Sequence, residues 1–189
     1  LPGRLSDWGE HKSTGDVLVR AGGIEDASKV SRDIRPSAHL PTLEMRLTDV
    51  CTRIEDALSI AAIYVCLCRM LYRLRRSNLS WRTYPVFLIA ENRWRAQRYG
   101  VEGTLFDFGK GSLVPFRDLL EEIIELVRED AAALGCTAEV EAARGILARG
   151  TSADRQVAAY RKEIAAGAPH EGALRGVVDH LIAETRDVG

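Results

Sequence analysis

Apolar and polar residues alternate with a period of two over residues 42–49. This alternation predicts a strand with one face against a core. The apolar face holds Leu43, Met45 and Leu47, and the opposite face holds Thr42, Glu44, Arg46 and Thr48. Residues 30–35, which end at Pro36, are a second strand candidate. Two strands alone make a marginal sheet, so the pair indicates more sheet beside it.

A longer apolar segment follows, and its spacing is helical. Residues 52–55 (Thr-Arg-Ile-Glu) have the pattern of a capping box, which predicts the start of a helix that ends near Arg76. Its first half is apolar nearly all round, so we expect a core helix that is buried on most sides. The apolar run over residues 57–68 is expected to be too short to span a bilayer.

The remaining pattern is mainly helical. Helices are predicted over residues 5–21, 85–99, 116–134, 138–148, 152–166 and 173–185, with a small hairpin over 104–108 and 113–114. The fold class is therefore α+β and mostly helical, with about six helices and a few antiparallel strands. We expect one domain over residues 1–189, cut from something longer because the chain starts Leu-Pro-Gly without Met.

Composition narrows the classes of function. The chain has 189 residues, with 46% hydrophobic and 28% charged residues and a net charge of −1. These values are typical of a soluble globular protein, and no basic field favours nucleic acid or an anionic membrane. The four cysteines form no zinc-binding spacing with each other or with the four histidines. We expect buried thiols in a reducing compartment and, with no signal peptide visible, a cytoplasmic protein.

Charged residues on the predicted strands are the first candidates for chemistry. Glu44 and Arg46 lie two residues apart, so their side chains project from the same face of a strand. A carboxylate there can hold Mg²⁺, and a guanidinium beside it can clamp a phosphoryl group. Arg35 is a second arginine borne by a strand. The alternative for all three is salt pairing on a solvated sheet face, which the spacing alone favours.

Two further polar segments have equally plain structural alternatives. Residues 91–95 (Glu-Asn-Arg-Trp-Arg) could be a helix surface with Trp94 in the core. Residues 150–156 read as a helix start capped by Thr151 or Ser152, where a phosphate could also dock. The histidines have no partner at catalytic or ligand spacing and receive no role.

The order of these segments carries more information than any one of them. The chain contains "DIRPS" at 33–37, "PTLEMRLTD" at 41–49, "ENRWRAQRYG" at 91–100, "GTSADRQ" at 150–156 and "VDHLIAET" at 178–185. In this order the segments resemble the carboxylate-amine ligase family of the glutamate–cysteine ligase type 2 group. The resemblance covers nearly the whole chain.

The resemblance implies the C-terminal portion of a glutamine-synthetase-like fold. It implies an ATP-dependent ligase that forms an amide (γ-glutamyl) bond through an acyl phosphate, from a carboxylate such as glutamate and an amine such as cysteine. By resemblance, Glu44 binds Mg²⁺, Arg46 contacts the phosphates of ATP, and Arg35 contacts a phosphate or the substrate carboxylate. Arg95 and Arg155 are further candidates for contact with ATP.

The same resemblance implies a missing N-terminal half, which in the family supplies a Glu-x-Glu metal-binding strand and most of the sheet. The chain by itself is then expected to bind Mg·ATP poorly and to catalyse nothing. The alternative is a non-catalytic remnant that acts as a binding or assembly module. Unpaired sheet edges also make self-association plausible.

Overall fold

The computed structural model describes residues 7–30, 33–37 and 39–187. The chain divides into two compact units, one formed by Leu1–Asp49 with Pro85–Ala90 and the other by Val50–Tyr84 with Glu91–Gly189. The fold is mostly helical with two small antiparallel sheets, which confirms the predicted fold class. The organisation as one domain stays a prediction.

The first unit contains one regular helix and one short sheet. Helix α1 (Trp8–Arg20) is capped by Asp7, whose Oδ1 accepts a hydrogen bond from the Glu10 amide at 2.9 Å. The helix was predicted from residue 5, which lies outside the described residues. A single turn of 3₁₀-helix, η1 (Ala27–Lys29), follows.

Strands β1 (Ile34–Pro36) and β2 (Leu43–Met45) pair antiparallel, with Arg35 opposite Glu44. Both are shorter than predicted, although the start of the first prediction falls partly on residues 31–32, which are not described. The prediction that the apolar face lies against a core is wrong for this unit. Leu43 is 56% and Leu47 54% exposed. Among the described residues of the first unit only Gly15 is buried, so no layer is available to cover that face.

Helix α2 (Ile54–Arg76) in the second unit has the predicted length, but its start is not a capping box. Arg53 occupies the N-cap position without a side-chain cap. The Thr52 hydroxyl instead donates to Oε2 of Glu184 at 2.8 Å. Partners that are distant in sequence have replaced the local bonds that the pattern favoured.

The expectation that α2 is buried on most sides is also wrong. Its buried residues are Asp56, Ser59, Cys66 and Met70, whereas Leu58, Val65 and Leu71 are about half exposed. By length and composition α2 could cross a membrane, contrary to the expectation from its apolar run, but a core helix of a soluble protein passes the same test. One face of α2 therefore contributes to the core, and the opposite face remains exposed.

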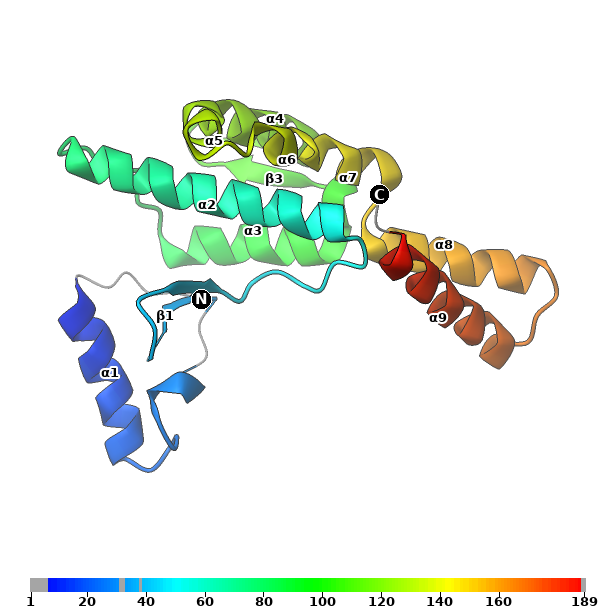
Figure 1. Cartoon of the computed structure of the whole chain (residues 1–189), viewed down its shortest axis with the longest axis horizontal. Helices are drawn as coiled ribbons and strands as arrows, with labels where there is room; N and C mark the ends of the chain where they lie inside the picture. The colour runs from blue at the N-terminus through cyan, green and yellow to red at the C-terminus, as the bar shows by residue number, and fades with distance from the viewer. Residues whose placement is uncertain (1–6, 31–32, 38, 188–189) are drawn as a thin grey trace. The chain divides into compact units, whose positions relative to one another are not determined.

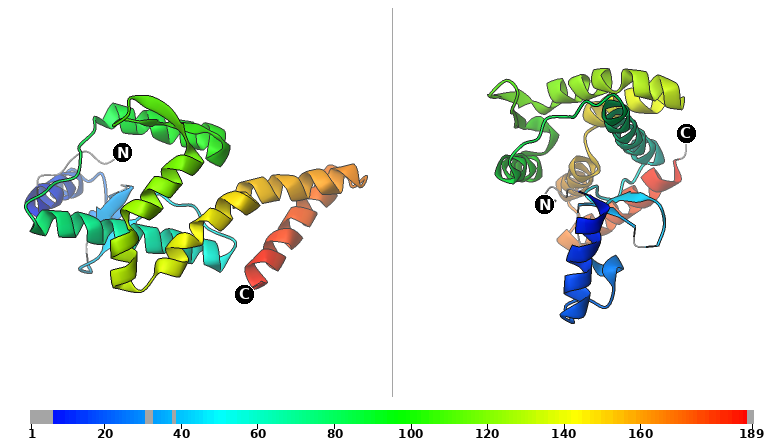
Figure 2. Two further views of the ribbon diagram at one scale, coloured as in Figure 1. Left: turned by 90° about the horizontal axis from the view of Figure 1, so that it is seen from above. Right: turned by 90° about the vertical axis from the view of Figure 1, so that its left-hand side faces the viewer.

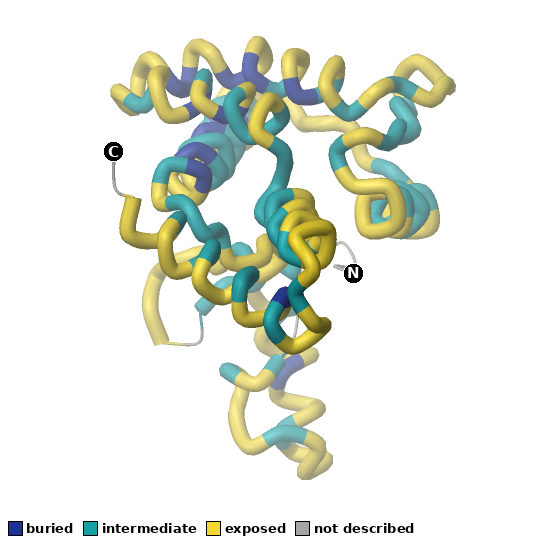
Figure 3. Tube along the Cα trace, turned by 90° about the vertical axis from the view of Figure 1, so that its right-hand side faces the viewer, coloured by how far each residue is buried: buried dark blue, intermediate teal, exposed yellow. Residues whose placement is uncertain are grey.

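The core of this unit lies between α2 and a run of four shorter helices (Figure 1). These are α4 (Phe116–Leu126), α5 (Arg128–Leu134), α6 (Thr137–Glu141) and α7 (Ala143–Arg149). The buried side chains are Cys66, Leu120, Ile124, Val127, Ala131, Val140 and Ala143. Figure 3 shows these buried positions on α2 and on the α4–α7 run, with exposed residues over most of α1.

Two helices that the sequence predicts as continuous are divided. The first breaks at Val127 (φ −97°, ψ 4°), after which α5 directs the fully buried Asp130 at Arg69 and Arg73. The hydrogen bond from Arg73 outweighs burial and holds the pKa of Asp130 below its ordinary value. The second predicted helix is divided at Ala142. A buried ion pair made by residues about 60 positions apart leaves no trace in local periodicity.

Helix α3 (Val86–Tyr99) is followed by the 3₁₀ turn η2 (Gly100–Glu102) and by the predicted hairpin. Strands β3 (Thr104–Asp107) and β4 (Ser112–Pro115) pair antiparallel, with Phe106 opposite Leu113. Gly111 at the turn has φ +67°, a conformation that favours glycine. The helix and the hairpin are confirmed as predicted, but Trp94 is 50% exposed and is not a core residue.

Helices α8 (Ser152–Ala165) and α9 (His170–Arg186) form an antiparallel pair (Figures 1 and 2). Thr151 caps α8 with a reciprocal capping box to Asp154, which confirms the predicted helix start. Helix α9 begins three residues earlier than predicted. The two helices approach closely at Gly176, where a Cβ atom would lie 2.7 Å from Cγ of Glu163.

Candidate active site

The β1–β2 hairpin brings together three of the predicted site residues. Because Arg35 and Glu44 are register partners, their side chains project from the same face, and Arg46 follows two residues later. Nε of Arg35 donates to Oε2 of Glu44 at 2.8 Å. Nε of Arg46 lies 3.6 Å from Oε1 of the same carboxylate. One carboxylate therefore sits between two guanidinium groups.

Arg35 is the more enclosed of the two arginines, with 14% of its side chain exposed. Its Nη1 donates to the carbonyl oxygen of Val30 at 2.9 Å and also to that of Ser28. These contacts tie the hairpin to the η1 turn. The hydrogen-bonding capacity of Arg35 is largely used within the protein, as expected of a positioning residue.

Glu44 and Arg46 are more accessible, with 45% and 46% of their side chains exposed. The hydrogen bond from Arg35, together with the charges of Arg35 and Arg46, holds the pKa of the Glu44 carboxyl below its ordinary value. Arg46 keeps guanidinium nitrogens beyond Nε that can meet an anion. The hairpin thus presents an ionised carboxylate and an accessible guanidinium on one face.

The described residues do not build a magnesium site. No group of three or more His, Cys, Asp or Glu is placed to hold a metal in the part of the chain that the structure describes. Magnesium prefers several oxygen ligands, and Glu44 offers one carboxylate that is already paired with two cations. The geometry is that of the salt-pair alternative, and metal binding by Glu44 stays a prediction.

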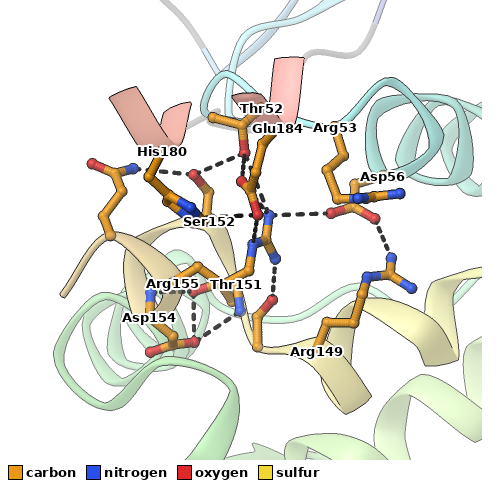
Figure 4. Close-up of polar contacts among 12 residues, drawn as sticks. Thr52, Arg53, Asp56, Arg149, Thr151, Ser152, Asp154, Arg155, His180 and Glu184 are labelled. Atoms are coloured by element: carbon orange, nitrogen blue, oxygen red, sulfur yellow. Dashed lines mark hydrogen bonds and ion pairs between the residues drawn. The ribbon is translucent and has the colours of Figure 1, made fainter. Parts of the chain in front are cut away.

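Arg155 lies in the second unit, at the centre of a largely buried polar cluster (Figure 4). Its Nε donates to Oε1 of Glu184 at 2.6 Å. Its Nη1 donates to the carbonyl oxygen of Gly150, and its Nη2 lies 3.3 Å from Oγ1 of Thr52. Asp56 lies on the same side, with Oδ2 3.7 Å from Nη2. The guanidinium joins the start of α2, the start of α8 and the end of α9.

The acidic residues of this cluster are paired as completely as Arg155. Asp56 accepts a hydrogen bond from Nη2 of Arg149 at 2.6 Å. Burial raises the pKa of Glu184, but the hydrogen bonds from Arg155 and Thr52 outweigh it, so the pKa lies below its ordinary value. With 14% of its side chain exposed and its nitrogens so engaged, Arg155 has the contacts of a structural residue. Its predicted contact with ATP stays a prediction.

Arg95 is also held by the protein. Its Nε donates to the carbonyl oxygen of Thr104 at 2.8 Å and its Nη2 to Oγ1 of the same residue at 2.9 Å. The guanidinium carbon lies 5.3 Å from the centre of the Phe106 ring. Arg95 fastens α3 to the β3–β4 hairpin, so the plain helix-surface alternative was too simple for this residue.

Comparison with known proteins decides the family. The family model of Glutamate-cysteine ligase family 2 (GCS2) matches residues 1–180. The chain belongs to this family. It is 57% identical over 185 residues to a Rhodospirillum rubrum protein named "Putative glutamate--cysteine ligase 2", a match that covers 98% of the chain and 48% of the relative.

Two more family members with the same name show the same pattern. The Jannaschia protein is 52% identical, with 97% of the chain and 48% of the relative covered. The Paracoccus denitrificans protein is 45% identical, with 98% of the chain and 50% of the relative covered. The chain spans about half the length of the curated relatives that it matches.

Sequence reasoning missed the acidic partners that fix Arg155, which are Glu184 and Asp56. Thr52 and Asp56 are about 130 residues away from Glu184, and no spacing rule connects positions so distant. The usable signal was the segment at 178–185, which contains Glu184 and which the resemblance had singled out without giving it a role. A buried position on an amphipathic helix that holds a carboxylate requires a cationic partner.

Proposed function

We propose that this chain forms part of an ATP-dependent carboxylate–amine ligase that joins glutamate to cysteine. The family is one of ATP-dependent carboxylate–amine ligases, and the relatives carry the name glutamate–cysteine ligase. In such a reaction the substrate carboxylate attacks the γ-phosphorus of ATP and releases ADP. The amine then attacks the acyl phosphate, forms the amide and releases phosphate.

The match of the family over residues 1–180 carries this proposal. The hairpin supports it chemically, because phosphoryl transfer needs cations where negative charge moves. Arg46 is half exposed and can contact a phosphate or carboxylate directly. Arg35 acts through Glu44, which it holds by a 2.8 Å hydrogen bond, so we assign it a positioning role. Glu44 keeps the guanidinium of Arg46 oriented.

To test this proposal, the chain is combined with the rest of a family member. The 189-residue chain is fused or coexpressed with the part of the Rhodospirillum rubrum relative that lies outside the match. ADP release is then measured with Mg·ATP, glutamate and cysteine. We expect turnover that requires both amino acids and is absent from the chain alone.

Variants of the hairpin test the assigned roles in the active assembly. Arg46→Ala should lower kcat/KM by about 100-fold or more, because one transition-state cation is lost. Arg20→Ala removes an exposed arginine of α1 and serves as the control, with kcat/KM unchanged. Equal activities of Arg46→Ala and Arg20→Ala would remove Arg46 from the reaction.

The alternative is a non-catalytic binding or assembly module. The chain spans half of its relatives, and Arg95 and Arg155 are held by protein partners. A joined protein that is folded yet releases no ADP with any pair of amino acid substrates would favour this alternative over the ligase.

A further inference from the structure

Helix α2 has two faces with the same residue spacing but opposite surroundings. The inner face packs against α5 and α6, and its residues follow each other by three and four positions: Asp56, Ser59, Ile63, Cys66 and Met70. A second row runs along the opposite side with a spacing of four and three. This row, the outer seam, consists of Ile54, Leu58, Ala61, Val65, Cys68 and Tyr72.

The outer seam is apolar along its length and largely uncovered. Leu58 is 53%, Val65 49% and Tyr72 65% exposed. Single exposed apolar residues are ordinary, but a continuous row along five turns of one helix marks a contact surface. The alternating spacing of four and three is the one that keeps a seam facing a packed neighbour.

The length of the relatives indicates what covers this seam. The matches to the Rhodospirillum, Jannaschia and Paracoccus proteins leave about half of each relative outside the aligned region. We propose that the outer seam of α2 is the docking face for the polypeptide that forms this other half of a family member. This inference rests on the proposed function, since it describes how the ligase is completed. The small side chains Ala61 and Cys68 let that polypeptide approach the helix backbone closely.

Cys68 provides a direct probe of docking because it lies within the seam and its side chain is partly exposed. Cys136 is also partly exposed but lies against Cys66 on the inner side, with the two sulfur atoms 3.5 Å apart. The full 189-residue chain is labelled with iodoacetamide, with and without the unmatched part of the Rhodospirillum rubrum relative. Peptide mass spectrometry then reports the labelling rate of each thiol.

We expect a one-to-one complex in which labelling of Cys68 slows at least tenfold, while labelling of Cys136 changes less than twofold. Leu58→Lys and Val65→Lys should each weaken the complex at least tenfold. The matched control is Val178→Lys on α9, which replaces a side chain that is 53% exposed and should leave the affinity unchanged. Circular dichroism checks that all three variants keep their helices.

Four results would overturn the proposal. Cys68 could be protected in the chain alone, which would place its cover within the 189 residues. The chain could form dimers that the other half does not dissociate, or bind phosphatidylcholine vesicles through Val65, which would give the seam to a second copy or to a membrane. An intact complex in the Leu58 and Val65 variants would place docking elsewhere. None of these readouts depends on turnover, so a docked but inactive complex would contradict only the ligase activity.

Discussion

Arg35 and Arg46 have the same charge and contact the same carboxylate, but they differ in what else holds them. Arg35 bonds two backbone carbonyl groups as well as Glu44, whereas Glu44 is the ion-pair partner that Arg46 has among the described residues. Loss of a buried donor leaves its acceptors unsatisfied and costs about 1–3 kcal/mol, while an exposed ion pair contributes under about 1 kcal/mol. Loss of Arg35 should therefore mainly lower the stability of the hairpin, whereas loss of Arg46 should mainly lower the proposed ligase activity.

Hydrogen exchange of the hairpin tests this difference. The Ser37 amide donates to the Thr42 carbonyl oxygen at 2.9 Å and reports on closure of the β1–β2 turn. Arg35→Ala should speed its exchange by roughly tenfold or more, because Val30 and Ser28 lose their donor. Arg46→Ala should change it by less than about fivefold. Similar rates in the two variants would mean that Arg35 does not position the hairpin.

The carboxyl of Glu184 makes stability depend on pH. Its pKa is lower in the folded protein than its ordinary value of 4.5, so the unfolded chain takes up the proton first as the pH falls. The stability that Glu184 contributes is complete above about pH 4.5 and is lost as the pH falls through the lower folded pKa. Asp130 acts in the same direction from its ordinary value of 3.8.

Urea unfolding between pH 6 and pH 3 should therefore show a falling free energy, by up to about 1.4 kcal/mol per pH unit for each such group. Glu184→Gln should flatten this slope while lowering stability at pH 6, because Arg155 loses its charged partner. Asp179→Asn, which changes an exposed carboxylate of the same helix, is the control and should keep the stability at pH 6. An unaltered slope in Glu184→Gln would contradict the assigned hydrogen bonds.

At the scale of elements, the amide side chain of Asn92 attaches α3 to the second sheet beside the contacts of Arg95. Nδ2 of Asn92 donates to the Phe106 carbonyl oxygen at 2.9 Å, and the Phe106 amide donates to Oδ1 of Asn92 at 2.7 Å. The side chain thus bonds the free edge of β3 as a neighbouring strand would. Both backbone groups of Phe106 depend on it.

Asn92→Ala should remove about 2 kcal/mol of stability and expose the Phe106 amide to rapid exchange, because both partners are lost. Asn92→Asp keeps an acceptor but no donor, so the amide of Phe106 should stay protected while part of the stability is still lost. Amide exchange followed by NMR distinguishes the two variants. Equal loss of protection in both would show that the acceptor of Asn92 does not hold this edge.

The elements also show what the sequence could and could not predict. Helical periodicity and the Thr151 cap were sufficient to place most helices, because each of these signals acts within a few residues. Thr52 has an equally good local pattern, yet its hydroxyl bonds Glu184 instead. The pairing of Arg35 with Glu44 follows from strand register, whereas the fixation of Arg155 depends on three helices that only the fold brings together.

At the scale of the molecule, the two units differ in how much apolar surface they bury. The second unit has a continuous core around Ile124 and Val127, both at most 1% exposed. The first unit buries only Gly15 among its described residues and leaves Trp8, Leu43 and Leu47 more than half exposed. Since burial of apolar surface is the main favourable contribution to folding, the two units should have different free energies of opening.

Hydrogen exchange of the whole chain followed by mass spectrometry tests this expectation. Peptides from α1 and the β1–β2 hairpin should exchange within seconds to minutes, and peptides over α4 and the inner face of α2 should exchange far more slowly. Val127→Ala removes buried methyl groups and should speed exchange in the second unit alone, with a cost of about 1–3 kcal/mol. If exchange in the first unit rose by the same factor, the two units would unfold as one.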